Sequence, residues 1–115
     1  ANIYINELKN LDKIQIVNPY QNNNITQNYY KFIIVLKTHN RIKVQKELLK
    51  NDIKLSGYVY EIPLHKQPIF KNYKNKNLKT SEKMCSNHIC LPIYHEMTER
   101  QAMYLTDKLK KIINN

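Results

Sequence analysis

Residues 60–70 read YEIPLHKQPIF, and this stretch holds one histidine, His65, between two prolines. Proline fixes φ and lacks a backbone N–H, so Pro63 and Pro68 are not expected inside a helix or a central strand. The residue before each proline is also pushed toward extended geometry. We therefore predict that residues 62–68 form a stiff, irregular, extended loop, which is either a packed corner or the wall of a site.

The length and composition of the chain are typical of one globular domain that spans residues 1–115. A chain of 115 residues can bury a core, and 42% hydrophobic and 24% charged residues are ordinary for soluble proteins. The start of the chain lacks the features of a signal peptide, and its longest aliphatic run, residues 32–36, is too short to span a membrane. Two cysteines do not make a disulfide framework. We therefore expect a cytoplasmic protein without membrane partners.

The formal net charge of +10 raises the question of a nucleic-acid partner. Of the 19 basic residues, however, only Arg41 and Arg100 are arginines, and arginine is expected where phosphate or guanine is recognised through two hydrogen bonds. The excess of lysine, together with many asparagines and isoleucines, indicates compositional drift, so we do not expect nucleic acid as a partner. Gly57 is the single glycine of the chain, which excludes glycine-rich phosphate-binding loops.

The spacing of apolar residues predicts four helices and four short strands. A continuous apolar run at residues 30–36 suits a central strand covered on both faces, and Gly57 suggests a bulge or a close approach in a strand over residues 53–61. Short strands mixed with helices predict an α+β fold with a small mixed or antiparallel sheet flanked by helices. The other predicted segments are helices at 2–11 and 41–50, a strand at 13–17, a polar loop at 18–28, a helix capped by Thr80 or Ser81 and ending near residue 87, a strand at 89–91 and a final helix.

Capping residues indicate where two of the helices begin and end. Asn40 is a suitable N-cap for the helix at 41–50, and residues 51–52 suit its end because Asn and Asp tolerate left-handed geometry. Thr98 and Gln101 fit a capping box at the start of the final helix, since each side chain can bond the other's free backbone N–H. The apolar stripe expected on that helix is Ala102, Leu105, Leu109 and Ile112.

Several motifs, in order, resemble the C-terminal domain of the DegT/DnrJ/StrS family of sugar aminotransferases, which have fold type I. The stretch from Tyr60 to Pro68 resembles the family's motif around Pro-Leu-His. Three residues depart from the family pattern: Asp52 replaces a glycine, Tyr30 stands where histidine is common, and Glu61 replaces a frequent proline. The further matching segments are 29–34, 41–53, 81–92 and 97–101.

This resemblance implies a function that composition does not show. The family's complete enzyme uses pyridoxal phosphate (PLP) to transfer an amino group, usually from glutamate, to a nucleotide-linked keto-sugar. A lysine of the large N-terminal domain holds the cofactor, and the active site lies at a homodimer interface. The small C-terminal domain packs against the large one and lends side chains to the substrate pocket. None of the lysines here stands in the family's lysine motif, so we expect the chain to be such a small domain, without catalysis or cofactor of its own.

Three residues of the opening stretch are our candidates for substrate binding. His65 either contacts the sugar nucleotide or the donor carboxylate, or is a buried histidine satisfied by the backbone. Tyr60 has an apolar ring and a polar tip that suit the wet edge of a pocket, and the alternative is a core aromatic at a strand end. For Gln67, hydrogen bonds that stabilise the loop compete with a substrate contact.

The sequence also contains a possible metal-binding cluster and is compatible with other functions. Cys85, His88 and Cys90 offer three metal ligands without a second cysteine pair, and small buried thiols are the better interpretation. Within the family, a dehydratase has histidine in place of the cofactor lysine. A standalone basic module that binds nucleic acid or protein, and a remnant without activity, are the remaining alternatives.

Overall fold

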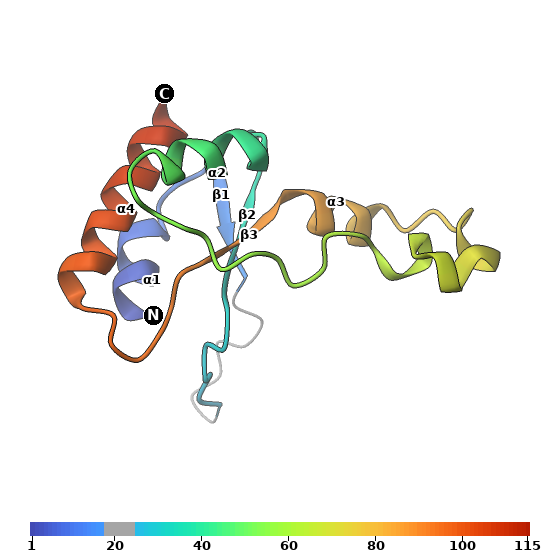
Figure 1. Cartoon of the computed structure of the whole chain (residues 1–115), viewed down its shortest axis with the longest axis horizontal. Helices are drawn as coiled ribbons and strands as arrows, with labels where there is room; N and C mark the ends of the chain where they lie inside the picture. The colour runs from blue at the N-terminus through green and yellow to red at the C-terminus, as the bar shows by residue number, and fades with distance from the viewer. Residues whose placement is uncertain (18–24) are drawn as a thin grey trace.

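The computed structural model describes residues 1–17 and 25–115, and it consists of a compact body with an arm that projects from one side (Figure 1). The body contains α1 (Asn2–Leu8), β1 (Ile14–Ile16), β2 (Phe32–Leu36), α2 (Arg41–Leu49), β3 (His88–Leu91) and α4 (Glu99–Asn114). The arm contains two 3₁₀ helices, η1 (Leu64–Lys66) and η2 (Pro68–Tyr73), followed by α3 (Lys79–Asn87). This combination confirms the predicted α+β class.

A three-stranded antiparallel sheet in the order β1-β2-β3 organises the body. Ile34 of β2 pairs with Ile16 of β1 on one side and with Ile89 of β3 on the other. The central position of β2 confirms the expectation from its continuous apolar sequence: four of its five residues are buried. Such a run is stable only where both faces of the strand are covered.

Helices α1, α2 and α4 cover one face of the sheet and close the hydrophobic core (Figure 1). On α4, Ala102, Leu105 and Leu109 are buried as predicted. Ile112, the last predicted member of the stripe, is half-buried and packs against the core, but Ile113 is the fully buried residue at this end of the helix. Position 113 lies four residues after Leu109, and this i, i+4 step keeps it on the core face of the helix.

The structure confirms three of the predicted caps. The side chain of Asn40 accepts hydrogen bonds from the backbone N–H groups of Ile42 (2.9 Å) and Lys43 (3.2 Å). Asp52, just beyond α2, adopts a φ of 60°, the left-handed geometry that was expected where this helix ends. Thr98 and Gln101 form the reciprocal capping box.

The predicted cap of α3 by Thr80 or Ser81 was wrong. The helix begins at Lys79, so both hydroxyl residues lie inside its first turn, and Leu78 occupies the N-cap position without a side-chain hydrogen bond. The predicted end near residue 87 is correct.

The predicted strand at 53–61 does not form. Ile53 and Leu55 are buried with exposed Lys54 between them, which is the alternation that suggested a strand. The backbone N–H of Ser56 donates to the carbonyl of Cys90 (3.0 Å), but Gly57 then takes a φ of 78°. This left-handed residue interrupts the extended backbone. Beyond it, the N–H of Val59 donates to the side chain of His88 rather than to the backbone of β3, so the ladder does not continue. Gly57 therefore ends a pairing rather than forming a bulge within it.

The opening stretch of the sequence begins the arm. Residues 62–68 are irregular but not extended throughout, because Leu64–Lys66 form a 3₁₀ turn in which the N–H of Lys66 donates to the carbonyl of Pro63 (2.9 Å). Gln67, the residue before Pro68, keeps the expected extended geometry, with ψ of 148°. The loop is therefore a corner rather than a straight segment.

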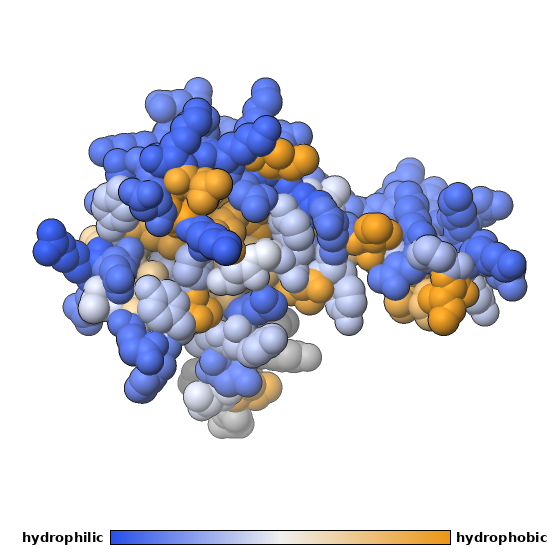
Figure 2. All heavy atoms as spheres, viewed as in Figure 1, coloured by the Kyte–Doolittle hydropathy of each residue, from blue (hydrophilic) through white to orange (hydrophobic). Residues whose placement is uncertain are grey.

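The arm has little core of its own. Helices η2 and α3 contain no buried residue, and apolar side chains are exposed among hydrophilic ones along the arm (Figure 2). The radius of gyration is 15.4 Å, above the value of about 13 Å expected for a compact chain of this length. The arm thus depends for its position on contacts where it joins the body.

Two further expectations concern the predicted polar loop and membranes. The loop at 18–28 lies partly outside the described residues, and residues 25–28 have no regular secondary structure. Within residues 1–17 and 25–115, no helix has the length and apolar character needed to cross a membrane.

Candidate functional site

Tyr60 lines a groove at the end of the sheet where the arm leaves the body. The groove has a volume of about 720 Å³. Tyr60 is 63% exposed and Tyr30 is 82% exposed, so both hydroxyls are accessible from solvent. We call this feature the tyrosine groove and define it by Tyr29, Tyr30, Lys31, Ile33, Val59 and Tyr60.

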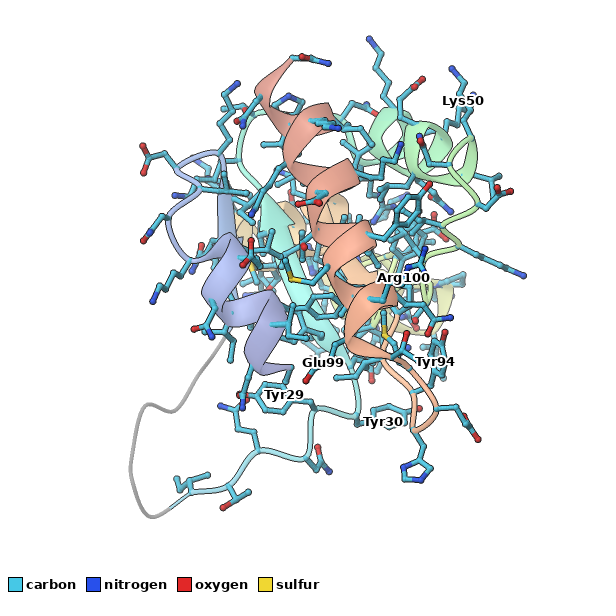
Figure 3. All side chains as sticks on the ribbon, turned by 90° about the vertical axis from the view of Figure 1, so that its left-hand side faces the viewer. Tyr29, Tyr30, Lys50, Tyr94, Glu99 and Arg100 are labelled. Carbon is cyan, nitrogen blue, oxygen red and sulfur yellow. The ribbon has the colours of Figure 1, made fainter. Side chains whose placement is uncertain are left out.

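Tyr29, in the segment before β2, has a strained backbone, and the neighbouring Tyr30 projects into solvent. Tyr29 has a φ of 47°, which side chains with a Cβ rarely adopt. Its ring stacks on Phe32, with 5.9 Å between the centroids, so Tyr29 is anchored on the body. Tyr30 then points in a different direction from the same segment (Figure 3), and its N–H donates to the side chain of Asn28 (3.1 Å). Strain of this kind often marks a functional site, since the surrounding contacts must maintain it.

The chemistry of the tyrosine groove suits a polar ligand with an anionic part. The ammonium group of Lys31 donates to the carbonyl of Ser56 (3.2 Å) and lies 5.6 Å from the centroid of the Tyr30 ring. Tyrosine hydroxyls can both donate and accept hydrogen bonds, and the ammonium has donors left for phosphate or carboxylate oxygens. Ile33 and Val59 supply apolar wall. The groove can therefore hold hydroxyl-rich and charged groups at once.

His65 does not join Tyr60 in this groove. It is 6% exposed and lies on the arm, where its Nε2 donates to Oε1 of Glu82 at 3.0 Å. Lys66 also binds Glu82, with its Nζ 3.1 Å from Oε2. The burial matches the alternative interpretation of His65, although its partner is a carboxylate on α3 rather than the backbone. The pair ties η1 to α3 across the arm.

These contacts change the acidity of Glu82. The hydrogen bond from His65, followed by that from Lys66, holds the pKa of the Glu82 carboxyl below its ordinary value. A carboxyl whose pKa is lowered in the folded state stabilises that state above its unfolded pKa. The stabilisation is lost as the pH falls through the folded pKa, so the arm should loosen in acid.

We predict that the closure of the arm is acid-sensitive through Glu82. Amide NMR signals of residues 64–67 and 79–83 should report opening in acid, at a pH below that at which an unpaired glutamate protonates. Glu82→Gln should show the open signals already at neutral pH. Glu96→Gln, at an exposed carboxylate without an ion pair among the described residues, is the matched control. An acid transition that persists in Glu82→Gln contradicts the assignment.

Gln67 stabilises the loop to which it belongs. Its Nε2 lies 3.5 Å from the carbonyl of Ile62, a long hydrogen bond that spans the 3₁₀ turn. Gln67 is absent from the set that defines the tyrosine groove. The geometry of the described residues thus brings Tyr60 to a groove, His65 to an ion pair, and Gln67 to its own loop.

Sequence reasoning missed the contacts of Arg41 that fix the root of the arm. Nη1 donates to the carbonyl of Cys85 at 2.6 Å, and Nη2 lies 3.3 Å from the carboxylate of Glu61. The guanidinium also lies 4.1 Å from the centroid of the Tyr58 ring. One side chain of α2 therefore holds both chain segments at the base of the arm. The separation of these partners in sequence left no local signal.

His88 holds the segment that carries Tyr60. The N–H of Val59 donates to Nε2 (2.9 Å), so the ring proton must sit on Nδ1, which donates to the carbonyl of Met84 (2.8 Å). The Tyr58 ring packs edge-on against the imidazole, with 5.8 Å between centroids. Both nitrogens of His88 are thus engaged, and the backbone beside Tyr60 is fixed.

The cysteines near His88 behave as small packing residues. Cys90 is fully buried and Cys85 half-buried, both as free thiols. Burial raises the pKa of the Cys90 thiol, which disfavours the thiolate that binds metals. No set of three or more metal-ligating side chains comes together within residues 1–17 and 25–115.

The α+β fold of this chain matches that of solved aminotransferases. The chain belongs to the DegT/DnrJ/EryC1/StrS aminotransferase family, whose model matches residues 1–110. This match confirms the resemblance found in the sequence.

One curated relative and two solved structures each match this chain over about 30% of their own length. An uncharacterized protein of Methanocaldococcus jannaschii is 28% identical over 99% of this chain and 30% of its own length. DesV of S. venezuelae, solved in complex with a ketimine intermediate, has the same fold, with a TM-score of 0.84 and 18% identity over 99% of this chain and 30% of DesV. NtdA of Bacillus subtilis, solved with bound cofactor PMP, has a TM-score of 0.78 and is 21% identical, over 99% of this chain and 27% of NtdA. The chain thus spans about 30% of these proteins' length.

Proposed function

We propose that this chain is the C-terminal small domain of a PLP-dependent aminotransferase that acts on a nucleotide-linked keto-sugar, with glutamate as amino donor. The observation that carries the proposal is the family match over residues 1–110 combined with coverage of only about 30% of its relatives. A ketimine intermediate in DesV and PMP in NtdA support amino-group chemistry for the complete enzyme.

The residues of this chain do not fit the cofactor by themselves. A lysine that forms a Schiff base is activated in a desolvated pocket, whereas every lysine of the described residues keeps at least part of its side chain exposed. PLP, when bound, supplies an electron sink to the substrate carbon. We therefore assign cofactor binding and catalysis to a large N-terminal domain of the parent enzyme, and substrate contacts to this chain.

The tyrosine groove is the substrate-facing surface in this proposal. Tyr60 and Tyr30 offer hydroxyl groups to the sugar, and the charge of Lys31 attracts the phosphates of a sugar nucleotide. His65 and Gln67 remain proposed substrate contacts on the ground of the family motif, although neither lines the tyrosine groove. Arg41 and His88 support this surface by fixing the base of the arm.

The remaining features of the parent enzyme follow from family membership. We propose a cytoplasmic homodimer in which this domain packs against the large domain, serving nucleotide-sugar synthesis for a surface polysaccharide or a related glycoside. The apolar side chains left exposed on the arm would find cover in such an assembly.

Substitution of Tyr60 in the full-length enzyme tests the proposal. Tyr60→Ala should lower kcat/KM for the keto-sugar about tenfold, mainly through KM, because it removes a hydrogen bond to bound substrate. Tyr73→Ala is the control, since Tyr73 lies on η2, is 56% exposed and does not belong to the tyrosine groove. His65→Ala in the same assay should also raise KM or lower kcat.

The outcomes separate substrate contacts from packing. If His65→Ala changes neither activity nor stability, His65 is spectator packing. If Tyr60→Ala and Tyr73→Ala have equal effects on kcat/KM, the tyrosine groove is not the substrate-facing surface. An enzyme that transfers no amino group to any nucleotide-linked keto-sugar would refute the proposed activity.

A further inference from the structure

The two arginines of the chain differ in how the fold uses them. Lysine strongly outnumbers arginine in this sequence. Each arginine is therefore a position at which to ask what the guanidinium group contacts. Arg41 is explained by its contacts at the root of the arm. The side chain of Arg100 is exposed and makes no hydrogen bond or ion pair with any residue that the structure describes. Its five N–H donors are therefore available to a ligand.

The position of Arg100 does not serve helix stability. It is the second residue of α4, which starts at Glu99. The N-terminal end of a helix carries partial positive charge, so a cation in the first turn is unfavourable. Glu99, at the preceding position, carries the negative charge that this end of the helix favours. The helix dipole therefore does not account for a guanidinium at this position.

Arg100 lines a second groove, which shares no residue with the tyrosine groove. It lies between the N-terminal half of α4, the turn after α2 and the loop that leads into α4, and its volume is about 610 Å³. This size falls within the range of small-molecule sites. We call it the arginine groove and define it by Asp52, Lys54, Tyr94, Met97, Arg100 and Tyr104. Figure 3 shows Arg100 and Tyr94 on the same flank of α4.

Two aromatic rings flank the charged groups of this groove. Tyr94 is 51% exposed and Tyr104 is 46% exposed, so part of each ring is open to a ligand. The ammonium group of Lys108 lies 5.3 Å from the centroid of the Tyr104 ring and occupies one of its faces. The hydroxyl of Tyr104 donates to the carbonyl of Asn51 (3.3 Å), which ties α4 to the turn after α2 and fixes this ring. Tyrosine rings bind flat apolar groups with little loss of side-chain entropy. The groove thus has preformed surfaces for a ring.

The charges of the groove favour an anion. Arg100 and Lys54 are cationic and Asp52 is anionic, and none of the three forms an ion pair within the described residues. A guanidinium binds carboxylate or phosphate through two parallel hydrogen bonds, which a lysine ammonium cannot do. The charge and the aromatic surfaces together select a flat ring that carries an oxyanion.

We propose that the arginine groove is a ligand site, separate from the proposed substrate surface, for a small molecule that contains both a flat ring and a phosphate or carboxylate. The oxyanion binds Arg100 and the ring lies against Tyr94 and Tyr104. A nucleoside phosphate and an aromatic carboxylate share this chemistry.

Titration of the 115-residue chain with uridine monophosphate, benzoate and uridine, followed by amide and arginine NMR signals, tests the site. Uridine monophosphate or benzoate should shift the signals of Tyr94, Arg100 and Tyr104, and uridine should not. The anion with the lower Kd shows whether the groove prefers a phosphate or a carboxylate. Arg100→Gln should raise Kd about tenfold or more, the loss expected when a charged hydrogen-bonding partner is removed.

Two further variants make the test specific. Asp52→Asn should lower Kd because it removes the opposing charge, and asparagine tolerates the φ of 60° at this position. Lys43→Gln removes one charge from the first turn of α2 and should change Kd by less than about twofold, as for an exposed charge. Equal weakening by Arg100→Gln and Lys43→Gln, equal affinity for uridine and uridine monophosphate, or no shift with either anion would overturn the proposal.

Discussion

Replacing Leu109 with alanine is expected to lower the free energy of unfolding by about 2–5 kcal/mol, the range for large-to-small substitutions at closed core positions. Leu109 is fully buried on α4, in the core cluster shared with α1, α2 and the sheet. The alanine variant loses buried apolar surface and leaves a cavity that the surrounding helices cannot fill. Chemical denaturation of both proteins measures the loss.

The same substitution at an exposed leucine is the matched control for Leu109→Ala. Leu49 lies at the end of α2 and is 60% exposed, so Leu49→Ala should change stability by less than about 0.5 kcal/mol. Similar losses at Leu109 and Leu49 would mean that α4 does not pack as described.

Replacing Arg41 with alanine should release the arm while the body stays folded. The change removes the hydrogen bond to the carbonyl of Cys85, the contact with the Tyr58 ring and the ion pair with Glu61. A charged hydrogen bond and a partly desolvated cation–π contact together make a local loss of about 2–4 kcal/mol reasonable. Amide hydrogen exchange should show lower protection at residues 59 and 84–88, with unchanged protection in β2 and α4.

Two further variants, Arg41→Lys and Lys43→Ala, show whether the loss of protection in the arm comes from the guanidinium group of Arg41. Lysine cannot stack on Tyr58 and donate in the same fork geometry, so Arg41→Lys should behave like the alanine variant. Lys43 is exposed on the same helix, so Lys43→Ala should leave protection in the arm unchanged. Full protection of residues 84–88 in Arg41→Ala would show that other contacts hold the arm.

Local sequence signals predicted the body of the fold well. Asn40 and the Thr98–Gln101 pair act on backbone groups two or three residues away, so their chemistry can be read from short stretches. The apolar run of β2 likewise predicted a central, covered strand. These features depend on neighbours in the sequence or on burial alone, and little else competes with them.

Features that depend on distant partners could not be predicted in this way. The segment 53–61 alternates like a strand, but its pairing with β3 ends because the backbone of Gly57 is left-handed. The contact of Arg41 with Cys85 joins residues 44 positions apart, and the hydrogen bond between Val59 and His88 joins residues 29 apart. No spacing rule relates such partners.

The candidate site likewise combines residues that short motifs indicated with residues that only the fold brings together. Family motifs directed attention to Tyr60 and His65 together, because they lie five residues apart in the sequence. The structure separates them: the 3₁₀ turn at Leu64–Lys66 directs His65 toward Glu82, whereas Tyr60 faces Tyr30 and Lys31 in the tyrosine groove. Tyr30 and Lys31 were missed as site residues because only the fold brings the start of β2 next to the base of the arm.

The coding DNA that precedes Ala1 tests the central claim most directly. If this chain is the small domain of an aminotransferase, the reading frame continues upstream into a large domain with a lysine in the family's cofactor motif. A histidine at that position would make the parent a dehydratase of the same family and would contradict amino transfer. A start codon or a stop codon directly before Ala1 would contradict the enzyme assignment as a whole.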